Sequence, residues 1–198
     1  MKKYKRFFGM LAASIMIFSM TLIAGATGMN KSTDEITRGE WIQALTTVFE
    51  MEIESDQMPD NYFSDLSAES PYYEDVLLAV EFGVLDIEAG GEVRAEDACT
   101  REFAADTLNY CLGFQLDPES VYEFSDIEEC TNADNVQIAL NRGWFTLIDG
   151  TFIPQEAITT EEYNAMLEDA EAVVASVVID DTAENEYVFA DFGEYCTV

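Results

Sequence analysis

An internal repeat constrains the fold of this 198-residue chain more than any other feature of its sequence. Two segments show the same order: a Phe-Ser-Asp start, an apolar run that ends at glycine, and a closing threonine. Phenylalanine and glycine are 20 residues apart in the first segment and 19 in the second, and glycine and threonine are 17 and 16 apart. Because repeated units stack to bury a shared core, the pattern predicts an array of units about 60 residues long. The defining residues are Phe63, Gly83 and Thr100, then Phe124, Gly143 and Thr159.

Each unit predicts a helix, a glycine stop, a loop and a second helix. Apolar residues recur at helical spacing in residues 71–82, and Gly83 follows as the residue type that favours a helix end. The residues that share this face are Tyr72, Val76, Ala79 and Val80.

The second helix of each unit is expected to start at a threonine cap. Two threonines have glutamate three positions on, which completes a capping box, whereas Thr100 is followed by Phe103 and keeps only the cap. The complete pairs are Thr37 with Glu40, in an incomplete upstream copy of the unit, and Thr159 with Glu162. Apolar faces follow all three threonines and predict a mainly α fold; they comprise Trp41, Leu45, Val48, Phe49, Ala104, Leu108, Cys111, Tyr163, Met166, Leu167, Ala170 and Val174.

Residues 1–26 predict a secretory signal peptide. Residues 1–8 hold four basic residues, residues 9–24 carry no charge, and Ala24-Gly25-Ala26 supplies a small-residue cleavage site. The alternative is an uncleaved membrane anchor, although a spanning helix needs roughly 20 apolar residues. We expect a secreted protein with no membrane contact after cleavage.

Charge and the absence of histidine exclude several classes of function. The chain has 40 acidic and nine basic residues, so its net charge is −31 and it repels nucleic-acid phosphate. No histidine is present to act as a general base or a zinc ligand. Carboxylate pairs arise by chance among so many acids, and no EF-hand loop occurs. We therefore expect no enzyme activity, no catalytic residue, no cofactor, no metal site and no nucleic-acid partner. The alternative for the metal is loose calcium binding, by Asp180-Asp181 or by the acids between Asp117 and Glu129.

Four cysteines are available to an exported chain. Their even number permits disulfides, but four are too few for a disulfide-built scaffold, and two of them occupy apolar positions of the pattern. Buried free thiols are the leading interpretation for Cys99, Cys111, Cys130 and Cys196.

Taken together, these motifs resemble the S-layer homology (SLH) domain. The resemblance rests on Phe-Ser-Asp, the helix that closes on glycine, the loop 149–154 (DGTFIP) and the start Ile36-Thr37-Arg38 of the next helix, and it covers residues 35–178. It implies a pseudo-threefold helical assembly, here of about 2.5 SLH-like helix-loop-helix repeats. The implied repeats are residues 35–55, 63–112 and 124–178, in a repeat domain that spans residues 27–178.

The resemblance also implies non-covalent attachment to the cell wall or S-layer of a bacterium. The ligand in the family is an acidic secondary wall polysaccharide that often carries a pyruvate ketal, bound in grooves between repeats where the threonine-arginine start of a helix meets the sugar. A helix N-terminus offers unpaired amides, and an arginine adds a bidentate fork for a carboxylate. The predicted carbohydrate-binding residues are Thr37, Arg38, Thr100 and Arg101, with Arg142 and Trp144 beside the last glycine stop.

The chain departs from the family pattern at two places. Thr160 replaces the arginine of the third motif, and residues 27–35 are too few to supply a Phe-x-Asp half for the first repeat. At most two of three grooves are therefore expected to bind. The competing interpretation is that Arg38 and Arg101 pair with nearby carboxylates, and that Trp41 and Trp144 belong to the core.

Residues 179–198 predict an acidic C-terminal tail with one short strand at Tyr187-Val188-Phe189. A cargo domain usually accompanies such repeats, so the chain is expected to be a truncated product or a small wall protein. The alternative function is a secreted structural or protein-interaction module that binds a protein partner on the cell surface and no carbohydrate.

Overall fold

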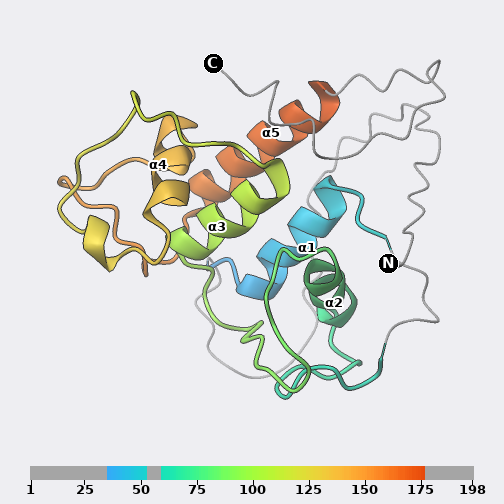
Figure 1. Ribbon diagram of the computed structural model, residues 1–198. Helices are drawn as coiled ribbons and strands as arrows, with labels where there is room; N and C mark the ends of the chain where they lie inside the picture. The colour runs from blue at the N-terminus through green and yellow to red at the C-terminus, as the bar shows by residue number, and fades with distance from the viewer. Residues whose placement is uncertain (1–34, 53–58, 177–198) are drawn as a thin grey trace, which may run out of the picture. The chain divides into compact units, whose positions relative to one another are not determined.

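The computed structural model describes residues 35–52 and 59–176, which form five α-helices, one 3-10 helix and no β-strand. The elements are α1 (Arg38–Val48), α2 (Tyr73–Glu81), α3 (Arg101–Leu112), η2 (Ile127–Glu129), α4 (Ala133–Asn141) and α5 (Thr160–Ser176) (Figure 1). The mainly α prediction is confirmed. Predictions for residues 1–26, for the strand and tail within 179–198 and for Cys196 lie outside the described residues. Among the helices of the described ranges, none combines the length and the apolar character needed to cross a bilayer.

The three threonine caps form as predicted. The Thr37 hydroxyl oxygen accepts a hydrogen bond from the Glu40 backbone N–H at 3.2 Å, and the Glu40 carboxylate accepts one from the Thr37 N–H at 2.7 Å. Thr100 accepts from the Phe103 N–H at 3.3 Å without a return bond. The box before α5 is complete, with bonds of 3.2 and 2.9 Å between Thr159 and Glu162.

Glycine ends the first helix of each unit. Gly83 and Gly143 have φ values of 78° and 73°, a left-handed conformation that a residue with a Cβ adopts only with strain. The N–H of Gly83 bonds to the Val80 carbonyl, and that of Gly143 bonds to the Leu140 carbonyl. The predicted glycine stops are therefore confirmed.

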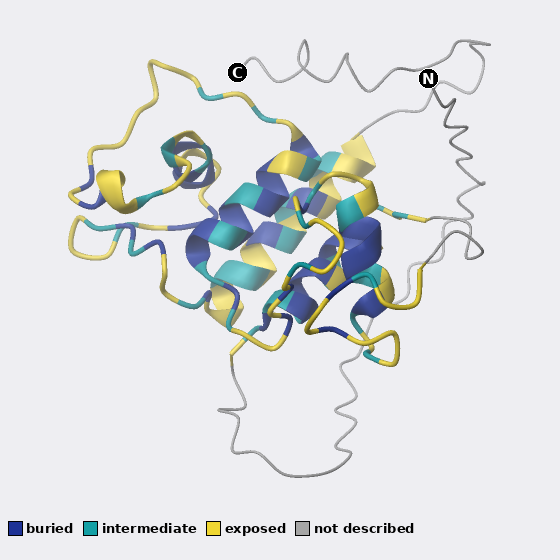
Figure 2. Cartoon of the chain, turned by 60° about the horizontal axis from the view of Figure 1, so that its bottom comes forward, coloured by how far each residue is buried: buried dark blue, intermediate teal, exposed yellow. Residues whose placement is uncertain are grey.

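Helices α1 and α3 each pack against α5, while α2 covers α1 and α4 covers α3. Trp41 joins three of these helices: it is fully buried on α1, its indole N–H donates to Thr107 Oγ1 of α3 at 2.8 Å, and its ring meets Tyr163 of α5 edge-on at 5.9 Å. The core assignment of Trp41 is thus confirmed. Figure 2 shows buried and exposed residues alternating along the helices. Val174 differs from its prediction and is 40% exposed, because the neighbouring Val173 takes the position that packs against the core.

The aspartate of each Phe-Ser-Asp motif holds the loop that precedes the next threonine. The Asp65 carboxylate accepts from the backbone N–H groups of Val93 at 2.8 Å and Arg94 at 2.7 Å. The equivalent bonds in the next unit join Asp126 to the N–H groups of Phe152 and Ile153, at 2.8 and 2.7 Å. In both pairs the second residue has a positive φ, which is rare for a residue other than glycine. The two sequence copies therefore form the same local contacts.

Candidate functional site

The backbone amides at the start of α1 are already bonded within the protein. The N–H of Arg38 donates to the Asp97 carbonyl and the N–H of Gly39 donates to the Ala95 carbonyl, each at 2.9 Å. A bridge between Thr37 and Ala98 holds the same segment in place. The expectation that free helix amides help to bind an anion is therefore wrong at α1.

The start of α3 repeats this arrangement with the segment that precedes α5. The Arg101 N–H donates to the Glu156 carbonyl at 2.9 Å and the Glu102 N–H donates to the Pro154 carbonyl at 3.1 Å. Thr100, like Thr37, uses its hydroxyl as a helix cap and its backbone in a bridge, here with Ala157. At both helices these backbone amides are therefore unavailable, and an anionic ligand can contact only side chains.

Arg101 is buried and neutralised inside the protein. Its side chain is 2% exposed, Nη1 forms an ion pair with Glu162, and Nη2 donates to the Thr146 carbonyl at 2.7 Å. The guanidinium carbon also lies 4.8 Å from the centre of the Phe145 ring and 4.9 Å from that of Phe152. Burial lowers the pKa of Arg101, and Glu162 opposes that shift. In this structure the guanidinium is not available to a ligand, as the competing interpretation of this residue expected.

Arg38 lies in a different environment. Its guanidinium carbon is 3.9 Å from the centre of the Phe103 ring, and it forms no ion pair with any described residue. The side chain is partly buried, which lowers its pKa, while the nearby carboxylates of Asp97 and Asp65 partly offset that effect. Stacking covers one face of the guanidinium and Nε is buried without a hydrogen-bond partner, so the two Nη groups are those left to bind a carboxylate.

Arg38 and Arg101 occupy equivalent positions, and the residue that each meets is equivalent too. Each arginine follows a capping threonine directly, and each contacts the third residue after the next capping threonine along the chain. That residue is Glu162 for Arg101 and Phe103 for Arg38. The glutamate missing from the middle capping box is therefore also the missing partner of Arg38.

No family model and no curated protein sequence matches the chain.

Tyr72 packs on the first turn of α1 beside these residues. A Cβ added to Gly39 would lie 2.6 Å from Tyr72 Cδ2, so only glycine permits this approach. Burial raises the pKa of Tyr72, and Glu40 and Glu96 raise it further. The candidate site therefore comprises Arg38, which has no ion-pair partner among the described residues, with the aromatic rings of Phe103 and Tyr72 around the start of α1.

Arg142 and Trp144 are brought together, but by a carboxylate of the protein. Arg142 Nε and Trp144 Nε1 both donate to Asp169 of α5, at 3.0 and 2.8 Å. The Arg142 guanidinium also stacks on Phe114, with 4.5 Å to the ring centre. Trp144 is only 2% exposed, which confirms the core interpretation and leaves no free face for a sugar ring. Arg142 is exposed, but its guanidinium is already paired with Asp169.

Sequence reasoning did not identify three residues that control this chemistry: Phe103, Glu162 and Asp169. The capping box of Thr100 lacks its glutamate because position 103 is phenylalanine. The sequence therefore did contain a signal that Arg38 meets no carboxylate there. Nothing local marks Asp169, which lies 27 residues from Arg142 along the chain.

Cysteine and acidic residues form no further reactive centre in the part of the chain that the structure describes. Cys99, Cys111 and Cys130 are free thiols there. Burial raises the pKa of Cys111 to about 12 and that of Cys130 to about 11. Over residues 35–52 and 59–176, no three His, Cys, Asp or Glu side chains are grouped to hold a metal ion.

Proposed function

We propose that this protein attaches to the bacterial cell wall by binding an acidic polysaccharide through Arg38. The proposal includes the finer fold interpretation, a pseudo-threefold arrangement of degenerate SLH-like repeats with α1, α3 and α5 as the motif helices. It assigns one competent groove rather than two, because Arg101 already has Glu162 as its anion.

The observation that carries the proposal is the contrast between Arg38 and Arg101. Four arginines lie in the described residues, and Arg94, Arg101 and Arg142 each form an ion pair there. Arg38 instead stacks on Phe103 with its edge N–H groups unpaired by any described carboxylate. A single carboxylate, such as that of a pyruvate ketal, matches this fork in shape and charge.

The surrounding charge predicts weak, salt-sensitive binding. The chain carries a net charge of −31, so a polyanion is repelled at long range and gains attraction only close to Arg38. Salt screens both effects over about 8–10 Å at physiological ionic strength. Because only one groove is competent, a wall polymer with many acidic sugars offers many equivalent places to bind but adds no multivalent gain for a single chain.

The direct test is co-sedimentation with purified walls of Gram-positive bacteria whose secondary polymer carries pyruvate ketals. Wild type is expected in the pellet, and Arg38→Ala is expected in the supernatant. Arg142→Ala is the matched control, because it removes the same charge from a residue that already pairs with Asp169. Arg142→Ala should sediment like wild type.

Removal of the ketals from the walls by mild acid supplies the ligand-side control. Sedimentation should then fall to the level of Arg38→Ala. Equal sedimentation of wild type and Arg38→Ala, on walls with ketals, would reject the proposal.

One observation favours the alternative, a protein-interaction module. The neighbouring residues Val121 and Tyr122 are 55% and 43% exposed in the segment between α3 and α4. If this alternative is correct, wild type should pull down a stoichiometric protein partner, and the double variant Val121→Ser/Tyr122→Ser should not. If the Arg38 proposal is correct, the double variant should sediment with walls like wild type.

A further inference from the structure

A polar pocket of about 840 Å³ lies at the C-terminal half of α3, beside α4 and the segment that joins them. The pocket is open to solvent, and its volume falls within the range of ligand sites, roughly 300–1,000 Å³. It contains none of the residues Arg38, Phe103 or Tyr72, so it is separate from the site proposed above. Its chemistry is different as well, since no lysine or arginine lines it.

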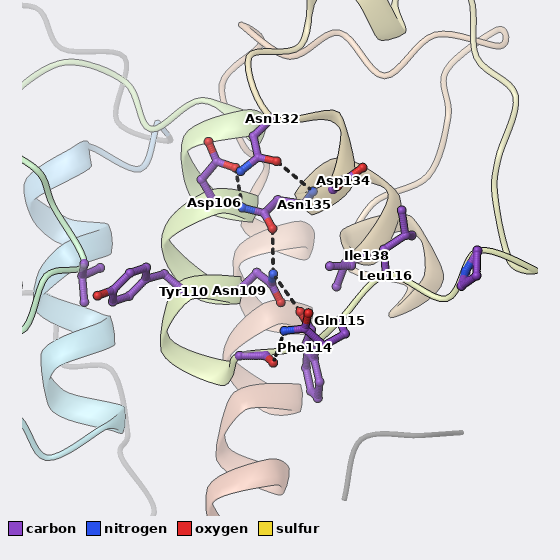
Figure 3. Close-up of a pocket in the computed structure, with 13 residues that line it drawn as sticks. Asp106, Asn109, Tyr110, Phe114, Gln115, Leu116, Asn132, Asp134, Asn135 and Ile138 are labelled. Carbon is purple, nitrogen blue, oxygen red and sulfur yellow. Dashed lines mark hydrogen bonds between the residues drawn. The ribbon is translucent and has the colours of Figure 1, made fainter. Parts of the chain in front are cut away.

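A relay of side-chain hydrogen bonds forms one wall of this pocket, as Figure 3 shows. Asn135 of α4 donates to Asp106 Oδ1 at 2.9 Å and accepts from Asn109 Nδ2 at 2.7 Å. The same Asn109 nitrogen also donates to the Phe114 carbonyl at 3.3 Å. These bonds fix the amide orientation of Asn109 and leave its Oδ1 as an acceptor.

Asn109 Oδ1 has no hydrogen-bond donor among the described residues, although Asn109 is only 6% exposed. A buried acceptor without a donor destabilises a protein, so such groups usually have a partner. The oxygen lies under the exposed turn at Gly113 and Gln115, where the Gln115 side chain makes one long bond of 3.3 Å. Because the oxygen itself is buried, a ligand hydroxyl reaches it only if that turn moves.

The polar groups of the pocket define the class of ligand. Asp106 and Asp134 supply carboxylate acceptors, and burial raises the pKa of Asp106. Amide groups of Asn132 and Gln115 add donors and acceptors on the rim. A hydroxyl both donates and accepts, so a ring with several hydroxyls satisfies this mixed set, whereas an acidic ligand meets two carboxylates and no cation.

We infer that this pocket binds a neutral, hydroxyl-rich sugar residue, with hydrogen bonds from its hydroxyl groups to Asp106 and to Asn109 Oδ1. The site goes beyond the proposed anchoring through Arg38 and does not depend on it. Tyr110, which is 57% exposed and points away from α4 in Figure 3, extends the lining to the other side of α3.

Ligand-observed NMR on the purified full chain tests this inference with defined probes. The neutral probes are the methyl glycosides of glucose, galactose and N-acetylglucosamine; glucuronic acid and ethanolamine are the charged comparisons. At least one neutral glycoside should bind with a millimolar Kd, and more tightly than either charged probe. Asp106→Asn preserves the shape of the relay and should weaken that binding by about tenfold, the effect of losing a charged acceptor.

Two further variants separate the outcomes. Asp134→Asn changes an exposed rim residue and should weaken binding less than Asp106→Asn, with no effect on folding. Arg38→Ala should leave the Kd of the neutral glycoside unchanged. Loss of wall sedimentation through Arg38 can therefore be distinguished from loss of glycoside binding in this pocket. Absence of binding by all three neutral glycosides, preference for ethanolamine, or an unchanged Kd in Asp106→Asn would each overturn the inference.

Discussion

Glu162 contacts Arg101 with one carboxylate oxygen and the Thr159 backbone with the other. Oε1 forms the ion pair with the buried guanidinium of α3, and Oε2 accepts from the Thr159 N–H at 2.9 Å. One side chain thus completes the cap of α5 and neutralises a charge on a neighbouring helix. The loss of this carboxylate affects two elements at once.

Glu162→Ala is expected to lower the free energy of unfolding by about 3 kcal/mol or more, since it leaves a buried charge without its partner. Urea denaturation followed by circular dichroism measures the change. Glu161→Ala removes an exposed carboxylate from the same helical turn and should change the stability by less than about 1 kcal/mol. Similar effects of the two substitutions would contradict the role of the ion pair.

Phe103→Glu should convert the surroundings of Arg38 into those of Arg101. The new carboxylate completes the capping box with Thr100 and pairs with the guanidinium that now stacks on the ring. The cap and the ion pair offset part of the apolar packing that Phe103 loses, so we expect a folded protein that no longer sediments with walls. Phe103→Leu removes the ring without adding a charge and should retain more binding than Phe103→Glu. Full sedimentation of a folded Phe103→Glu protein would show that Arg38 does not carry the binding.

Acid should destabilise the protein partly through Asp126. Burial raises the pKa of this carboxyl, but the hydrogen bonds from the N–H groups of Phe152 and Ile153 outweigh that effect, so the net shift of the pKa is downward. The unfolded-state value is about 3.9, so the stabilisation by Asp126 is present above that pH and is lost as the pH falls through the lower folded-state pKa.

Asp126→Asn should therefore lower the free energy of unfolding at pH 7 by about 2 kcal/mol, the scale of a hydrogen bond to a charged group. It should also reduce the loss of stability between neutral and acid pH, as measured by urea melts at several pH values. Glu128→Gln, at an exposed residue of η2, should leave both quantities near wild type. An unaltered pH dependence in Asp126→Asn is the contrary result.

Thr107→Val should destabilise the contact between α1 and α3. The substitution keeps the side-chain shape and removes the oxygen that accepts the indole N–H of Trp41 at 2.8 Å. A buried N–H without an acceptor lowers stability by about 1–3 kcal/mol. Thr47→Val is the control, because the Thr47 hydroxyl donates only to a backbone carbonyl of its own helix and Thr47 is exposed. Thermal melts of the two variants give the comparison, and equal melting temperatures would argue against the Trp41 bond.

Much of the local structure could be predicted from the sequence. The threonine caps of α1, α3 and α5 and the stops at Gly83 and Gly143 all formed where the pattern placed them. Each of these signals acts within about four residues, so the chain nearby contains the information. The core position of Trp41 followed from helical spacing for the same reason.

The candidate site could be predicted only in part. Arg38 and Arg101 looked alike in sequence, since each follows a capping threonine, yet one is buried on Glu162 and the other stacks on Phe103. Their partners lie more than 60 residues further along the chain. Arg142 and Trp144 also meet on a distant residue, Asp169 of α5, which lies 27 and 25 residues further along the chain.

The amino-acid sequence by itself determined the helices, their caps and stops, and the scarcity of cations in a strongly acidic chain, because hydrogen bonding and apolar spacing within a few residues set these features. Only the tertiary structure decided which arginine stays available and that the helix amides are already bonded. Packing brings distant segments together, and a guanidinium or an amide takes whatever acceptor the neighbouring helix or loop presents.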